Sequence, residues 1–168
     1  MGKIRDDMDQ RLIDAIDKHG WQGMSVASRA DEPDDGPAFC YSIGFETSLG
    51  LPNVIIFGLR TNVMHGMLWQ VFDALKAGRT LEDRSVWPEP LEGYKCELRA
   101  VHRTNLVSDY FGYGLWYHER YLERTDPYSA FQLFWPGVGE KLLPWEEGCH
   151  EDVIAAQPRL DLPHKDLH

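Results

Sequence analysis

The sequence has no long apolar run and no basic N-terminal segment. No stretch of the 168 residues approaches the roughly 20 consecutive apolar residues that a membrane-spanning helix needs. Asp6, Asp7 and Asp9 occupy the N-terminus, where a secretion signal would have a basic start followed by an apolar core. These absences predict a cytoplasmic protein with no membrane partner.

Positive charge is scarce as well. The 17 basic side chains are outnumbered by 27 acidic ones, which gives a formal net charge of −10. Such a field repels phosphate backbones, and the basic residues are scattered along the chain instead of forming a block. The composition therefore predicts an acidic protein that does not bind nucleic acid.

Cysteine is also scarce, and its positions form no metal-binding or redox motif. Cys40, Cys96 and Cys149 are far apart and include no C-x-x-C pair, so we expect three free thiols. Cys40 and Cys96 fall on inward faces of predicted strands, which favours buried, inert thiols over nucleophiles. The spacing of other potential metal ligands is unconvincing, so we predict no metal site and no cofactor. The potential ligands are His102, His118, Glu119, Cys149 and His150.

The remaining composition is that of a folded globular domain. Hydrophobic residues make up 43% of the chain and charged residues 26%, which is the usual balance for such domains. A chain of this length needs only one core. We predict a single domain over residues 1–157, followed by a loosely held, polar tail at residues 158–168.

Apolar residues at helical spacing predict three helices. In the first helix, Met8 and Leu12 belong to the apolar face and Asp9 to the polar face. The third helix contains Gly112 and Gly114, each of which weakens it by about 1 kcal/mol relative to alanine. The helices are expected before Gly20, from Thr61 or Asn62 to Gly78, and from Asn105 to about Tyr121.

Alternating residues and one apolar run predict the strands. Residues 54–57 are all apolar, which is typical of a central strand covered on both faces. In residues 94–103, Glu97 and Arg99 are expected to face water and Ala100 to face inward. The predicted strands are 21–28, 38–45, 54–57, 94–103 and 130–135, with a polar loop at 30–37.

The order of these elements predicts the class of fold. No glycine-rich phosphate loop joins a strand to the helix that follows it. We therefore expect an α+β fold, in which a largely antiparallel sheet is packed by about three helices in a single compact domain.

Several separated motifs, in a particular order, resemble the bacterial domain-of-unknown-function family 4262. They are Tyr41-Ser42-Ile43-Gly44-Phe45-Glu46, Leu51-Pro52-Asn53, residues 55–59, residues 111–117, residues 132–136 and Pro144-Trp145-Glu146. The likeness extends over about residues 20 to 158. It implies the extent of the domain and an intracellular bacterial origin, and it implies no particular activity.

Aromatic residues are concentrated in the second half of the chain. Half of the 20 aromatic residues lie between positions 110 and 135. Such a segment could wall a ligand pocket, or it could form a bulky core with tyrosines at its rim. Gln132 lies among these apolar residues and needs hydrogen-bond partners if it is buried, either from a ligand or from the backbone. The candidates for a ligand site here are Tyr113, Trp116, Gln132, Trp135 and Trp145.

Polar candidates lie at the ends of predicted strands, where functional residues are common. Tyr41, Ser42 and Glu46 follow one another at the end of residues 38–45, and His102 lies near the end of residues 94–103. The sequence around Ser42 has no G-x-S-x-G motif, so nothing specific indicates a serine nucleophile. A structural turn is the alternative interpretation of this segment.

Three hypotheses for function follow from these features. The first is a small-molecule-binding or accessory interaction module with an aromatic-lined pocket. The alternative is a small enzyme, a hydrolase or transferase, that uses Tyr41, Ser42, Glu46 or His102 near that pocket. The third is a homo-oligomer that buries its aromatic residues between subunits. The expected partner is accordingly a small molecule, another protein or a second copy of the chain.

Overall fold

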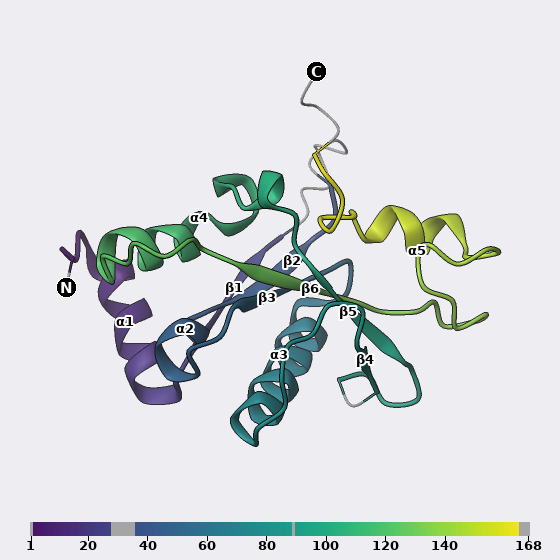
Figure 1. Ribbon diagram of the computed structural model, residues 1–168, viewed down its shortest axis with the longest axis horizontal. Coiled ribbons are helices and arrows are strands. Elements are labelled where there is room, and N and C mark those ends of the chain that lie inside the picture. Colours follow the sequence, from purple (N-terminus) through teal and green to yellow (C-terminus); the bar gives the residue numbers. More distant parts are fainter. Residues whose placement is uncertain (1, 28–35, 89, 165–168) are drawn as a thin grey trace.

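The fold is built on one six-stranded sheet with helices on both of its faces (Figure 1). A computed structural model describes residues 2–27, 36–88 and 90–164. Most of the predicted polar loop, residues 30–35, and the last four residues of the predicted tail lie outside the described residues.

The strands follow the order β1-β2-β3-β6-β5-β4 in the sheet. Every neighbouring pair is antiparallel except β3 and β6, which are parallel. The prediction of an α+β fold with a largely antiparallel sheet is therefore confirmed. The strands are β1 (Gln22–Val26), β2 (Phe39–Ile43), β3 (Asn53–Phe57), β4 (Val86–Trp87), β5 (Cys96–Ala100) and β6 (Ala130–Phe134).

The pairing brings several strand ends to the same end of the sheet. Asn53 and Ala130 are the first residues of the parallel strands β3 and β6, and they lie side by side. Strand β2 runs antiparallel to β3, with Tyr41 opposite Ile55, so β2 ends beside the start of β3. The short helix α2 (Phe45–Ser48), which the sequence analysis did not predict, begins immediately after this strand end.

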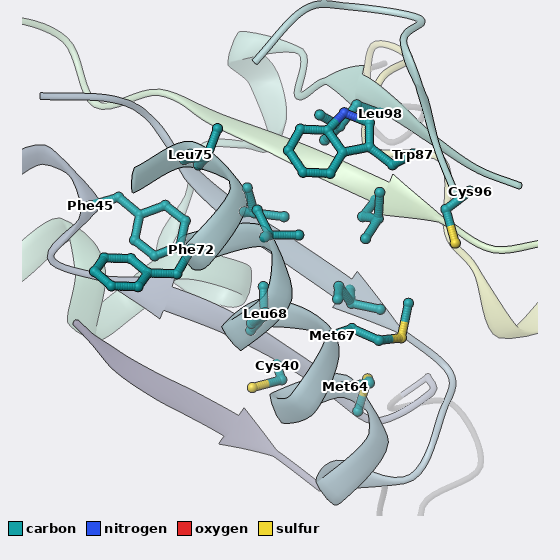
Figure 2. Close-up of a cluster of buried hydrophobic side chains, with 14 of the residues drawn as sticks. Cys40, Phe45, Met64, Met67, Leu68, Phe72, Leu75, Trp87, Cys96 and Leu98 are labelled. Atoms are coloured by element: carbon teal, nitrogen blue, oxygen red, sulfur yellow. The ribbon is translucent and has the colours of Figure 1, made fainter. Parts of the chain in front are cut away.

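One face of the sheet is covered by α3 (Thr61–Lys76). This helix matches the prediction, because its buried apolar residues recur at helical spacing on the side that packs against the sheet. Figure 2 shows Phe72 of α3 lying beside Phe45, with a distance of 5.6 Å between the ring centroids. The buried residues of α3 are Met64, Met67, Leu68, Val71, Phe72 and Leu75.

The other face is covered by α1 (Asp7–His19) and α4 (Ser108–Trp116) (Figure 1). Helix α1 was predicted, but the assignment of its faces was partly wrong. Met8 is 61% exposed, whereas Asp9 is fully buried. Asp9 can be buried because Arg5 donates to its carboxylate from the backbone N–H at 2.8 Å and from the guanidinium at 2.9 and 3.1 Å, and the Tyr113 hydroxyl of α4 donates a fourth hydrogen bond.

The prediction of one continuous helix from Asn105 to Tyr121 was wrong. A 3₁₀ turn, η2 (Arg103–Asn105), precedes α4, and a π-helical turn, η3 (Tyr117–Tyr121), follows it. Within α4, Phe111 departs from helical geometry, with φ of −127° and ψ of 26°. Gly114 allows the helix to approach the sheet, since a Cβ atom there would lie 2.8 Å from the Tyr128 hydroxyl oxygen. Packing against the sheet therefore determines the path of this segment.

Strand β5 is shorter than predicted, and its two faces are less distinct. Ala100 is exposed, whereas Glu97 and Arg99 have side chains that are only 15% exposed. The C-terminal part of the chain explains this difference, because the Asp161 carboxylate lies 3.7 Å from Arg99. An unpredicted helix, α5 (Glu151–Ala156), leads into this segment.

Residues 157–162 pack across β5 and β6 through side-chain amides. Gln157 accepts a hydrogen bond from the backbone N–H of Trp135 and donates one to its carbonyl. Gln132 donates to the carbonyl of Pro158 and accepts from the N–H of Leu160. Gln132 therefore holds the backbone, which is one of the two roles left open for it by the sequence.

Across the residues that the structure describes, no helix combines the length and apolar composition needed to cross a bilayer.

The burial of Asp9 makes stability depend on pH. Hydrogen bonds from Arg5 hold the pKa of Asp9 well below its ordinary value of 3.8, with Tyr113 assisting and burial opposing the shift. A depressed pKa in the folded state means that the carboxylate stabilises the fold above pH 3.8 and loses this contribution as the pH falls below that value.

Asp9→Asn should lower the free energy of unfolding by about 2 kcal/mol at neutral pH, because it removes the charge of a buried carboxylate that accepts hydrogen bonds from Arg5 and Tyr113. Urea denaturation at a series of pH values measures the difference from the wild type. That difference should shrink as the pH falls below 3.8. The matched variant Asp17→Asn, at an exposed position of the same helix, should change stability by less than about 0.5 kcal/mol. A pH-independent difference for Asp9→Asn would contradict this role of the carboxylate.

Candidate functional site

A network of buried polar side chains lies where β2, α2 and β3 meet. Asn53 is its centre: the Oδ1 atom accepts hydrogen bonds from Ser42 Oγ at 3.0 Å and from the N–H of Phe45 at 3.2 Å. The Nδ2 atom donates to Glu46 Oε1 at 3.1 Å. Ser42 Oγ also accepts from the N–H of Val54 at 3.0 Å. One amide side chain therefore joins the end of β2, the start of α2 and the start of β3.

The turn into α2 directs Glu46 toward a histidine from a distant part of the chain. Gly44 has a φ of +107°, which favours glycine, and its N–H donates to Glu46 Oε1 at 3.1 Å. Glu46 Oε2 lies 3.0 Å from His118 Nδ1. The other ring nitrogen, His118 Nε2, lies 2.9 Å from the carbonyl oxygen of Asp126. A carbonyl oxygen can only accept a hydrogen bond, so Nε2 is the donor in this contact.

The π-helical turn η3 positions His118. Its wider turn places two consecutive residues, Tyr117 and His118, toward the protein interior. The Tyr117 hydroxyl lies 2.6 Å from Thr47 Oγ1, next to the contact between His118 and Glu46. Burial raises the pKa of Tyr117, and the Thr47 hydrogen bond opposes that shift. Such π-helical turns occur frequently at functional sites.

A pocket of about 90 Å³ opens beside this network. Glu46 and His118 form its buried part, with side chains that are 8% and 4% exposed. Arg124 and Asp126, at 37% and 52%, form its solvent-exposed part. Arg124 donates two hydrogen bonds to Asp126 at 2.8 and 2.9 Å, which lowers the pKa of that carboxyl. The full lining consists of Glu46, Gly50, Leu51, Pro52, Asn53, His118, Arg124, Asp126, Pro127 and Ser129.

Two of the polar candidates from the sequence, Ser42 and Glu46, belong to this network, and Glu46 also lines the pocket. The hydroxyl of Tyr41 instead accepts from the N–H groups of Tyr113 and Gly114, at 3.1 and 3.4 Å, and so holds α4 against β2. His102 Nδ1 lies 2.9 Å from the Thr104 hydroxyl in η2.

The aromatic candidates occupy several separate places. Tyr113 bonds to Asp9 of α1, and the ring of Trp116 lies 4.5 Å from the guanidinium of Arg5. Trp135 is buried and donates from Nε1 to the carbonyl of Phe57 at 2.7 Å. The ring of Trp145 is flanked by the guanidinium groups of Arg99 and Arg159, at 4.1 and 4.7 Å. The structure therefore does not bring these side chains together around one pocket, and a role for them in binding stays a prediction.

Sequence reasoning missed Asn53, Arg124, Asp126 and Ser129 as candidate residues, and it considered His118 only as a potential metal ligand. Asn53 had a visible signal, because a lone polar residue opens an otherwise apolar strand within the Leu51-Pro52-Asn53 motif. His118 gave no comparable signal, since its partner Glu46 lies 72 positions earlier in the chain.

The described part of the chain contains no group of three His, Cys, Asp or Glu side chains arranged to hold a metal ion. Cys40 and Cys96 are buried, and burial raises the pKa of both thiols, that of Cys96 to about 12. Cys149 is partly exposed, and its pKa is raised by burial and by the nearby Glu140 and Glu146.

The fold and the pocket together define an α+β domain with a preformed polar site at one end of its sheet. The chain belongs to the family described as Domain of unknown function (DUF4262), whose model matches residues 15–150. The matched region includes Ser42, Glu46, Asn53 and His118, and it confirms the resemblance found in the sequence. No curated protein and no solved structure matches the chain.

The three thiols should differ sharply in reactivity toward Ellman's reagent. At slightly alkaline pH the native protein should react at Cys149 alone, because this thiol is partly exposed whereas the reagent cannot reach the buried thiols of Cys40 and Cys96. Unfolding in denaturant should make the thiols of Cys40 and Cys96 reactive as well. The variant Cys149→Ser should show almost no rapid reaction in the native state. Equal reaction of all three thiols in the folded wild type would contradict the packing of both strands.

Replacing the centre of the network should destabilise the fold. Asn53→Ala removes the acceptor of the Ser42 hydroxyl and of the Phe45 N–H, and one of the two donors to Glu46 Oε1, so we expect a loss of about 3 kcal/mol. Urea denaturation measures the loss. The exposed Asn62→Ala is the control, with an expected change below about 0.5 kcal/mol. A loss as small as that of the control would mean that the network does not hold the strand ends together.

Proposed function

We propose that this chain is a small-molecule-binding module, and that the pocket beside Glu46, Asn53 and His118 is its binding site. The observation that carries the proposal is the buried Glu46–His118 pair, which Asn53 fixes within a pocket that reaches solvent. Burying such a pair costs desolvation free energy, and well-packed apolar residues often stabilise a fold as well or better. Preorganised polar groups in a concave site, in contrast, lower the cost of binding a ligand.

The size and charge of the pocket define the class of ligand. About 90 Å³ accommodates roughly three water-sized groups, so the pocket takes a very small molecule or the polar end of a larger one. Its two carboxylates, Glu46 and Asp126, are already paired with His118 and Arg124. An uncharged group that both donates and accepts hydrogen bonds, such as a primary amide, therefore fits better than an ion.

The binding site in this proposal is a polar pocket, whereas the sequence suggested an aromatic-lined pocket. Glu46 is the only candidate from the sequence that lines the pocket. The acidic composition and the likeness to a bacterial family support a cytoplasmic bacterial setting. Binding of another protein, or of a second copy of the chain, stays an untested expectation.

The enzyme hypothesis receives less support from the geometry. Ser42 is fully buried, and its hydroxyl is engaged by Asn53 and Val54. A serine nucleophile needs an accessible oxygen and an adjacent base, whereas His118 Nε2 is held by the carbonyl of Asp126. A hydrolase or transferase using Tyr41, Ser42, Glu46 or His102 stays the untested alternative.

The proposal can be tested through the imidazole resonances of His118. In ¹H–¹³C spectra of the protein, millimolar acetamide should shift these resonances saturably, whereas acetate and methylammonium should shift them less. Glu46→Gln should weaken acetamide binding at least about tenfold, because hydrogen bonds to charged groups contribute roughly 1.5–3 kcal/mol. The matched variant Glu147→Gln changes an exposed carboxylate outside the pocket and should leave the affinity unchanged.

Two results would overturn the proposal. One is the absence of any shift of His118 with all three probes. The other is hydrolysis of p-nitrophenyl acetate by the wild type that Ser42→Ala abolishes and Glu147→Gln preserves, which would favour the enzyme.

A further inference from the structure

A second hollow lies between α1, β1 and α4, and it shares no lining residue with the Glu46 pocket. Its volume is about 270 Å³, close to the lower end of the roughly 300–1,000 Å³ that is typical of small-molecule sites. The lining residues are Met8, Arg11, Leu12, Gln22, Met24 and Tyr113.

The walls of this hollow are mainly apolar. Met8 is 61% exposed on the surface of α1, and Leu12, one turn further along the helix, is buried beside it. Met24 of the edge strand β1 packs against the same cluster of residues as Leu12. Methionine side chains adapt to the shape of apolar ligands. An exposed methionine beside a concave apolar surface is therefore suited to cover a bound hydrocarbon.

One wall is rigid. The Tyr113 hydroxyl donates to the buried carboxylate of Asp9, which Arg5 holds from the other side. Burial and the neighbouring Asp9 raise the pKa of Tyr113, so its hydroxyl stays protonated and keeps this hydrogen bond. The ring therefore presents a fixed surface to the hollow before any ligand arrives, which reduces the entropic cost of binding.

A single cation completes the lining. Arg11 is exposed on α1, and within residues 2–27, 36–88 and 90–164 its guanidinium takes part in no ion pair or hydrogen bond. Arg5, Arg99, Arg124 and Arg159 each pair with a carboxylate instead. Among the described residues, the guanidinium of Arg11 is the only cation that lines the hollow, and its planar shape suits bidentate binding of a carboxylate.

We propose that this hollow binds an amphipathic carboxylate, with the ligand's carboxylate on Arg11 and its hydrocarbon chain against Met8, Leu12 and Met24. The positive charge of Arg11 selects an acid over a neutral amphiphile. The limited volume selects a medium-length chain, and octanoate is a suitable probe. This site is independent of the polar pocket, since the two share no residue.

Methionine methyl groups report directly on binding of octanoate. In the wild type labelled with [methyl-¹³C]methionine, octanoate should shift Met8 and Met24 saturably. It should leave Met64 and Met67 unchanged, because these are buried side chains of α3, on the other face of the sheet. Octanol, which has a similar chain without the charge, should bind at least about tenfold more weakly, the loss expected for a charge-assisted hydrogen bond.

Variants test the role of the charge on Arg11. Arg11→Gln should weaken octanoate binding about tenfold and leave octanol binding unchanged. Lys18→Gln removes a charge from the same helix outside the hollow and should bind octanoate as the wild type does. The proposal is overturned by unshifted Met8 and Met24 methyl groups, by equal affinity for octanol, by an Arg11→Gln affinity equal to that of the wild type, or by comparable shifts at Met64 and Met67.

Discussion

The side-chain amide of Asn53 is the interaction on which the arrangement of the site depends. It satisfies the Ser42 hydroxyl, the Phe45 N–H and a Glu46 oxygen in a region that is almost inaccessible to water. Each of these groups would destabilise the fold if left without a partner, since interior polar groups cannot recover the hydrogen bonds that they make with water. The amide therefore fixes α2 relative to β3, and α2 in turn presents Glu46 to His118.

His118, the partner of Glu46 in this contact, is positioned by packing between α4 and the sheet. The Tyr41 hydroxyl of β2 accepts from two N–H groups of α4, and the absence of a side chain at Gly114 permits the close approach. The helix continues into a π-helical turn, which directs both Tyr117 and His118 inward. Two residues of strand β2 thus support the pocket: Ser42 bonds to Asn53, and Tyr41 bonds to α4.

Elements with strong local patterns could be predicted from the sequence. The apolar residues of β3 and the helical spacing of α3 are sufficient by themselves, because burial of these elements follows directly from their own residues. The interruption of α4 could not be predicted, since it reflects contacts with Tyr41 and Tyr128. The burial of Asp9 likewise depends on Tyr113, which lies 104 positions away.

The site, too, was predictable only where the signal lies in neighbouring residues of the sequence. Ser42 and Glu46 could be chosen because they follow a strand end, but the pairing of Glu46 with His118 spans 72 positions. Ser42 and His118 do not bond to each other, but they belong to one network through Asn53 and Glu46. A double-mutant cycle of Ser42→Ala and His118→Ala, measured by urea denaturation, tests this most directly. A coupling free energy of at least about 0.5 kcal/mol is predicted, whereas additive effects within about 0.3 kcal/mol would contradict the account.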